Sequence, residues 1–78
     1  MDNTIEINVR LQTSKLESRL ELNEIEIYTL NRTINSYLAS PESREIAAKR
    51  REALLYENSA MREELEQMRK AYPEAAKR

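Results

Sequence analysis

The apolar residues of this chain recur at the spacing of helices that pack side by side. Two segments, about residues 14–38 and 41–71, carry their seam residues in alternating steps of four and three, which is the heptad spacing. In the first segment these positions are Leu16, Leu20, Asn23, Ile27, Leu30, Ile34 and Tyr37. In the second they are Ala47, Arg51, Leu54, Asn58, Met61, Leu65, Met68 and Tyr72. The pattern predicts two helices, each burying one seam.

The residues between the two segments are typical of a helix boundary. Ser40 can cap a helix N-terminus, and Pro41 suits the first helical position because the N–H that it lacks would have no partner there. The first helix is therefore expected to end near Leu38, followed by a turn at residues 39–41.

A short turn makes the two helices antiparallel, and the seams then predict which residues face one another. Facing residues of an antiparallel pair have position numbers with a constant sum. The two seams pair with a sum of 81, which places Asn23 opposite Asn58 and centres the register between Ser40 and Pro41. We therefore predict an all-α fold, an antiparallel two-helix coiled-coil hairpin that forms one unit over residues 1–78.

The ends of the chain are less regular. Residues 1–13 form an arm that allows two interpretations, because its apolar residues alternate with polar ones as in a strand, while Val9 and Thr13 continue the heptad seam. The alternating residues are Ile5, Ile7, Val9 and Leu11, and Ser14 with Glu17 forms a capping box for a helix that would start after the arm. We favour the helix. Pro73 should end the second helix, leaving residues 73–78 as a tail.

Composition narrows the classes of function. The chain has no cysteine, histidine or glycine, so it lacks the common zinc ligands and the glycine loops that cradle phosphates. A two-helix hairpin also has no enclosed cavity in which catalytic groups could converge. We expect a protein that is not an enzyme and that has no catalytic residues, no cofactor and no metal site.

Charge and hydropathy give expectations about location and partners. No apolar run reaches the length of a membrane span, and the first residues lack the basic start and apolar block of a signal peptide. We expect a cytoplasmic protein with no membrane partner. The formal net charge is −1, and the one basic cluster, Lys49-Arg50-Arg51, is flanked by Glu45 and Glu52, so the sequence argues against nucleic-acid binding. Arg51 is expected to reach water with its charged head.

Apolar residues outside the seam predict a second interface. The candidates are Leu22 and Ile25 on the first helix and Ile46, Ala53, Leu55 and Tyr56 on the second. A hairpin that buried only its seam would leave these residues in water, and so short a chain lacks buried area. We expect a protein–protein interaction module, an adaptor, scaffold or small chaperone, that pairs with itself as a dimer or higher oligomer such as a four-helix bundle, or with a helical partner.

Two stretches resemble known families of short helical proteins. Residues 16–34, Leu16-Glu-Ser-Arg-Leu20 continuing as LELNEIEIYTLNRTI, resemble the start of the SlyX family of short bacterial coiled-coil proteins, which has no established mechanism to carry over. The stretch from Pro41-Glu42 to Ala53-Leu54 resembles the second helix of the small co-chaperones that hold type III secretion needle subunits. Arg44 stands where that family commonly has an aromatic residue.

A third resemblance implies a different function. Ile7-Asn8-Val9-Arg10-Leu11 resembles the strand of ribbon-helix-helix DNA-binding dimers. It would make the chain a DNA-binding regulator that uses residues 5–12 as an N-terminal arm, with Asn8, Arg10 and Gln12 facing the bases. The glycine-containing turn of that family is absent, and a continuous helix through this stretch would remove the reading element.

Overall fold

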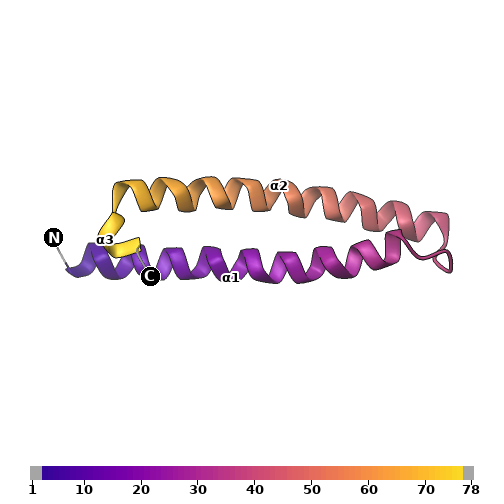
Figure 1. Cartoon of the computed structure of the whole chain (residues 1–78), viewed down its shortest axis with the longest axis horizontal. Coiled ribbons are helices and arrows are strands. Elements are labelled where there is room, and N and C mark those ends of the chain that lie inside the picture. Colours follow the sequence, from indigo (N-terminus) through magenta and orange to yellow (C-terminus); the bar gives the residue numbers. More distant parts are fainter. Residues whose placement is uncertain (1–2, 77–78) are drawn as a thin grey trace.

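The structure, a computed structural model, describes the backbone of residues 3–76 and the side chains of residues 4–74. Two long helices, α1 (Asn3–Ile34) and α2 (Pro41–Ala71), lie antiparallel and side by side over most of their length, and a short helix, α3 (Pro73–Ala76), follows (Figure 1). The part of the chain described contains no strand. The predicted all-α helical hairpin is confirmed, as a rod with extents of 56 × 15 × 15 Å.

α1 is continuous from Asn3, so the strand interpretation of residues 5–12 is wrong. The helix is favoured because Val9 and Thr13 extend the seam and are buried, at 8% and 2% exposure, whereas a detached strand would leave them in water. No glycine or proline interrupts the sequence before position 41. Residues 3–13 are therefore part of α1 and not a separate arm, and residues 1 and 2 lie outside the described part.

α1 ends at Ile34, earlier than the expected boundary near Leu38, and the connection is residues 35–40 in place of a turn at 39–41. Asn35 follows the helix, and Ser36 then accepts a hydrogen bond from the Leu38 N–H at its hydroxyl, 3.2 Å, which competes with helical bonding. Tyr37, expected on the seam, is consequently 87% exposed.

α2 has the predicted boundaries. The Ser40 hydroxyl accepts a hydrogen bond from the Ser43 N–H, 3.1 Å, and Pro41 occupies the first turn. After Ala71, the Tyr72 N–H donates to the Met68 carbonyl, 2.8 Å. Residues 73–76 form α3 where a tail was expected, and α3 turns back to contact α1 (Figure 1). Residues 77 and 78 lie outside the described part.

The core is a single row of side chains between α1 and α2. The buried residues are Val9, Thr13 and Asn23 from α1 and Ala47, Leu54, Asn58, Met61 and Leu65 from α2. Most of the other predicted seam residues are half-buried, namely Leu16, Leu20, Ile27, Leu30 and Ile34 on α1 and Arg51 and Met68 on α2, whereas Tyr37 and Tyr72 are exposed. Two helices cover only one side of each other, so the rest of each surface stays exposed.

Candidate functional site

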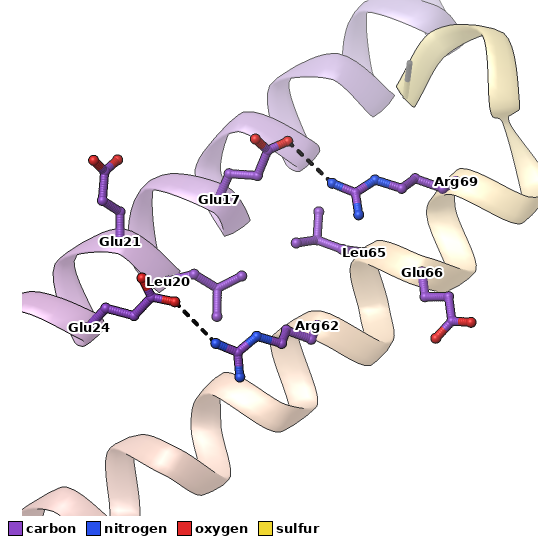
Figure 2. Close-up of a pocket in the computed structure, with 8 residues that line it drawn as sticks. All are labelled: Glu17, Leu20, Glu21, Glu24, Arg62, Leu65, Glu66 and Arg69. Atoms are coloured by element: carbon purple, nitrogen blue, oxygen red, sulfur yellow. Dashed lines mark hydrogen bonds and ion pairs between the residues drawn. The ribbon is translucent and has the colours of Figure 1, made fainter. Parts of the chain in front are cut away.

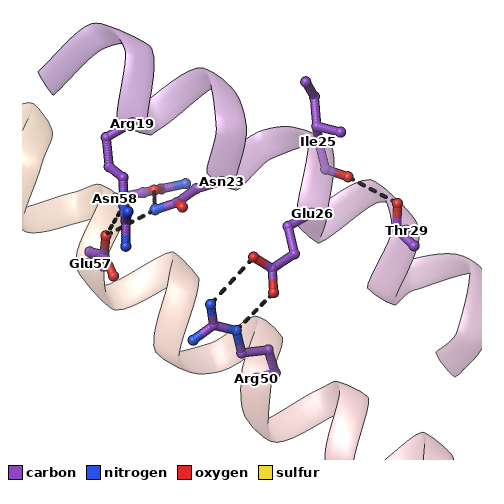
Figure 3. Close-up of polar contacts among 8 residues, drawn as sticks. All are labelled: Arg19, Asn23, Ile25, Glu26, Thr29, Arg50, Glu57 and Asn58. Atoms are coloured by element: carbon purple, nitrogen blue, oxygen red, sulfur yellow. Dashed lines mark hydrogen bonds and ion pairs between the residues drawn. The ribbon is translucent and has the colours of Figure 1, made fainter. Parts of the chain in front are cut away.

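A polar contact occupies the middle of the seam. The amide of Asn23 donates from Nδ2 to Oδ1 of Asn58 over 2.8 Å and also to Oε1 of Glu57 over 3.2 Å (Figure 3). The two asparagines are 4% and 1% exposed. Asn23 and Asn58, which were predicted to face one another, do so and are hydrogen-bonded, and the predicted register is confirmed.

Ion pairs between α1 and α2 line both sides of the seam. On one side Arg19 pairs with Glu57 over 3.0 Å and Arg50 with Glu26 over 2.8 Å (Figure 3). On the other side Arg62 pairs with Glu24 over 3.1 Å and Arg69 with Glu17 over 3.8 Å (Figure 2). Their position numbers add to 76 on the first side and to 86 on the second, placed symmetrically about the seam sum of 81. All four pairs therefore belong to one register.

The first of these sides discriminates against misaligned helices. Its charges change sign along each helix, with Arg19 and Glu26 on α1 and Arg50 and Glu57 on α2. Sliding one helix by a heptad would bring Arg19 to Arg50, or Glu26 to Glu57, depending on the direction. Like charges that face one another across helices are destabilising. Together with the buried asparagine pair, this flank selects a single alignment.

These contacts also shift ionisation at the surface. The Arg50 hydrogen bond, assisted by its positive charge, lowers the pKa of Glu26, and the same contact raises the pKa of Arg50. Hydrogen bonds from Asn23 and then Arg19 lower the pKa of Glu57. Both carboxylates are therefore held in the ionised form that keeps the helices paired.

The basic cluster is engaged within the chain. Lys49 pairs with Glu45 over 3.4 Å, and Arg50 pairs with Glu26. Nη1 of Arg51 donates to Oδ1 of Asn31 over 2.7 Å, although this head group was expected to reach water. The contacts of Arg50 and Arg51 therefore join α2 to α1, whereas the Lys49–Glu45 pair lies within α2.

An open groove lies near the free end of the hairpin, on the side of the seam that carries the Glu17–Arg69 and Glu24–Arg62 pairs (Figure 2). Leu20 and Leu65 project between the helices at its base, and the Glu17–Arg69 and Glu24–Arg62 pairs bridge it. Glu21 and Glu66 complete the lining. Within residues 3–76, no three His, Cys, Asp or Glu side chains are grouped so that they could hold a metal ion. The Glu17–Arg69 and Glu24–Arg62 pairs join α1 to α2, whereas Glu66 pairs with Lys70 within α2.

All the predicted interface residues are exposed, but they do not form one surface. Leu22 and Ile25 lie on α1, and Ile46, Ala53, Leu55 and Tyr56 lie on α2. Ile25 and Tyr56 share one level of the hairpin, and each is on the side of its helix opposite the seam, so they point in opposite directions. Figure 3 shows Ile25 on the side of α1 away from α2. The exposed apolar residues of α1 and those of α2 therefore lie on opposite edges of the rod.

Sequence reasoning missed two exposed apolar residues of α1, Ile7 and Tyr28, which are 56% and 67% exposed. Ile7 was assigned to the possible strand, which hid its position on the helix. Tyr28 lies three residues after Ile25 on the same outer side and would have been found by marking every apolar residue off the seam.

The fold and its contacts define an antiparallel α-hairpin with a fixed register and two solvent-exposed outer edges. No family model, curated protein or solved structure matches this chain. Among the helices of residues 3–76, none has an apolar stretch long enough for a membrane crossing.

Proposed function

We propose that this chain is a protein–protein interaction module that acts by helix pairing, as an adaptor, scaffold or small chaperone. The observation that carries the proposal is the set of large apolar side chains left exposed outside the seam of the hairpin. On the two long helices the set includes Ile7, Leu11, Leu22, Ile25, Tyr28, Ile46, Leu55 and Tyr56, each at least half exposed.

The amount of exposed surface supports the proposal that a partner covers part of this chain. The chain exposes 6104 Å², whereas a compact protein of its mass would expose about 4,900 Å². The excess of about 1,200 Å² is larger than the roughly 800 Å² that each partner buries in a standard interface. A rod of two helices can therefore bury a full interface on one edge and still keep a hydrated surface.

The fixed register also suits a binding role. Because the asparagine pair and the flanking ion pairs hold α1 and α2 in one alignment, the outer edges are presented without a further ordering step. Less conformational entropy is then lost on association. The DNA-binding alternative has no comparable support, since residues 5–12 are helical and Arg10 pairs with Glu6 over 2.7 Å.

The test is capture of the tagged chain from the organism that encodes it, with mass measurement of the purified complex. We expect a mass above the 9.2 kDa of one chain, from self-association or from a stoichiometric helical partner. Ile25→Glu and Tyr56→Glu are assayed separately, because they probe opposite edges, and at least one should abolish the complex. Gln67→Glu adds the same charge at an exposed polar position and should leave it intact. A monomer at tens of micromolar with no stoichiometric partner would refute the proposal.

A further inference from the structure

We infer that the pairing surface is the outer face of α1, and that its occupant is a second copy of this chain, packed antiparallel about a two-fold axis at Ser18. The outer face of α1 is the side opposite the seam, and its large residues are Ile7, Leu11, Leu22, Ile25 and Tyr28. The inference rests on the proposed function and specifies its surface and partner.

The two outer edges differ in charge. Between residues 4 and 32, the side of α1 opposite the seam carries only three ionisable side chains with full charge at neutral pH, Lys15, Glu21 and Arg32. The corresponding side of α2 carries charges at almost every turn, including Glu42, Lys49, Glu63 and Lys70. Desolvating α2 would remove many charges from water, whereas desolvating α1 removes few. α1 is therefore the edge suited to burial.

Two polar side chains of this face, Thr29 and Ser18, are compatible with burial in an interface. The Thr29 hydroxyl donates to the carbonyl of Ile25, 3.2 Å, within the same helix (Figure 3). Its donor is thereby satisfied without a partner. Ser18, between the apolar groups, is small enough to let two helix backbones approach closely.

The face is complementary to itself. Leu11 and Ile25 lie seven residues on either side of Ser18, so a two-fold axis there places Leu11 of each copy against Ile25 of the other. On one flank the axis brings Ile7 near Tyr28, which are eleven residues before and ten after Ser18. On the other flank Lys15 meets Leu22 and can cover it with its aliphatic stem.

This pairing matches an isologous dimer interface, in which each contact occurs twice. It satisfies every large apolar residue named for the face, and it places both charged α2 edges outward in water. The product is a flat layer of four helices in the order α2, α1, α1, α2. Its formation would bury the type of area that the rod exposes in excess.

The position of the axis is tested by disulfide cross-linking of the full chain. The sequence has no cysteine, so Ser18→Cys introduces a single thiol beside its own copy, and mild oxidation should convert most of the protein to a covalent dimer. Ser59→Cys, at an exposed position on α2, is the matched control and should remain largely uncross-linked. Equal cross-linking of the two variants would overturn the axis.

The face is tested by sedimentation equilibrium over about 1–200 µM. Leu11→Lys and Ile25→Lys should each raise the dimer dissociation constant by about 100-fold, because each substitution acts twice in the interface. Tyr56→Lys should leave it unchanged, and circular dichroism should show that all variants remain helical. A monomeric wild type that still binds another protein would overturn this inference but leave the proposed function standing. Dissociation by Tyr56→Lys alone would place self-pairing on α2 and also overturn it.

Discussion

At the residue scale, the asparagine pair shows that a buried polar contact can lower the stability of the hairpin while fixing the alignment of its helices. Asn23 and Asn58 are both buried and satisfy one another over 2.8 Å, but an amide pair gains little net free energy because both groups were hydrogen-bonded to water in the unfolded chain. Sliding the helices would leave each amide buried without that partner. The pair therefore penalises wrong registers more than it stabilises the right one.

Replacing both asparagines with leucine should stabilise the hairpin by about 1 kcal/mol or more, because apolar surface then fills the same site. Asn23→Leu alone should gain less than the double change, since it leaves the Asn58 amide buried without its donor. Thermal and urea unfolding of the single and double variants would measure this coupling. A double variant clearly less stable than the wild type would contradict the interpretation.

Thr13 carries a cost of the same kind without a visible benefit. Its side chain is 2% exposed, and its hydroxyl oxygen has no hydrogen-bond partner. Thr13→Val keeps the shape and removes the hydroxyl, so it should raise the free energy of unfolding by about 1 kcal/mol. Thr13→Ser is the control, because it keeps the hydroxyl and deletes the buried methyl, and it should be less stable than the wild type in the same urea titration.

At the scale of the elements, the pairing of α1 with α2 depends on ionised carboxylates at its edges. Polar residues interrupt the apolar seam at Asn23, Asn58 and the half-buried Arg51. The ion pairs beside the seam therefore help to determine the alignment of α1 with α2. Exposed pairs stabilise only weakly one at a time. The Arg19–Glu57 and Arg50–Glu26 pairs matter because their charges alternate in sign along each helix, which opposes a slide of one heptad in either direction.

The stability of the helix pair should fall in acid. The pKa values of Glu26 and Glu57 are lowered in the folded chain, below the ordinary glutamate value of about 4.3. Their stabilising contribution is therefore complete above that value and is lost as the pH falls through the folded-state pKa. The melting temperature should decline below about pH 5, and Glu26→Gln should reduce that decline. About 1 M salt, which screens exposed charges, should reduce it as well. An identical pH profile for Glu26→Gln and the wild type would count against the Glu26–Arg50 contact.

At the scale of the whole molecule, the rod shape explains why much of the surface of each helix stays exposed. A rod of 56 × 15 × 15 Å has a large surface for its volume, and its seam buries only one side of each helix. Charge keeps the outer edge of α2 hydrated, while the outer edge of α1 carries Leu22, Ile25 and Tyr28. That asymmetry, combined with the small core, is the reason that we propose association through α1.

The sequence by itself determined the two helices, their seams and their register. Helical periodicity and the placement of Asn23, Asn58, Ser40 and Pro41 are properties of the chain that can be read before any contact is known. The exposed candidates Leu22 and Ile25 were found in the same way, because a residue off the seam of a two-helix hairpin faces water.

Only the tertiary structure decided the ends of α1 and the geometry of the outer edges. Alternation in residues 5–11 fits a strand as well as a helix, and burial of Val9 and Thr13 against α2 made the choice. The heptad pattern continued to Tyr37, but α1 ended at Ile34, and in the connection that follows the Ser36 hydroxyl accepts a hydrogen bond from the Leu38 N–H. The pattern of apolar residues in one segment does not show where the chain turns back or which residues become buried. Both depend on where the other helix lies.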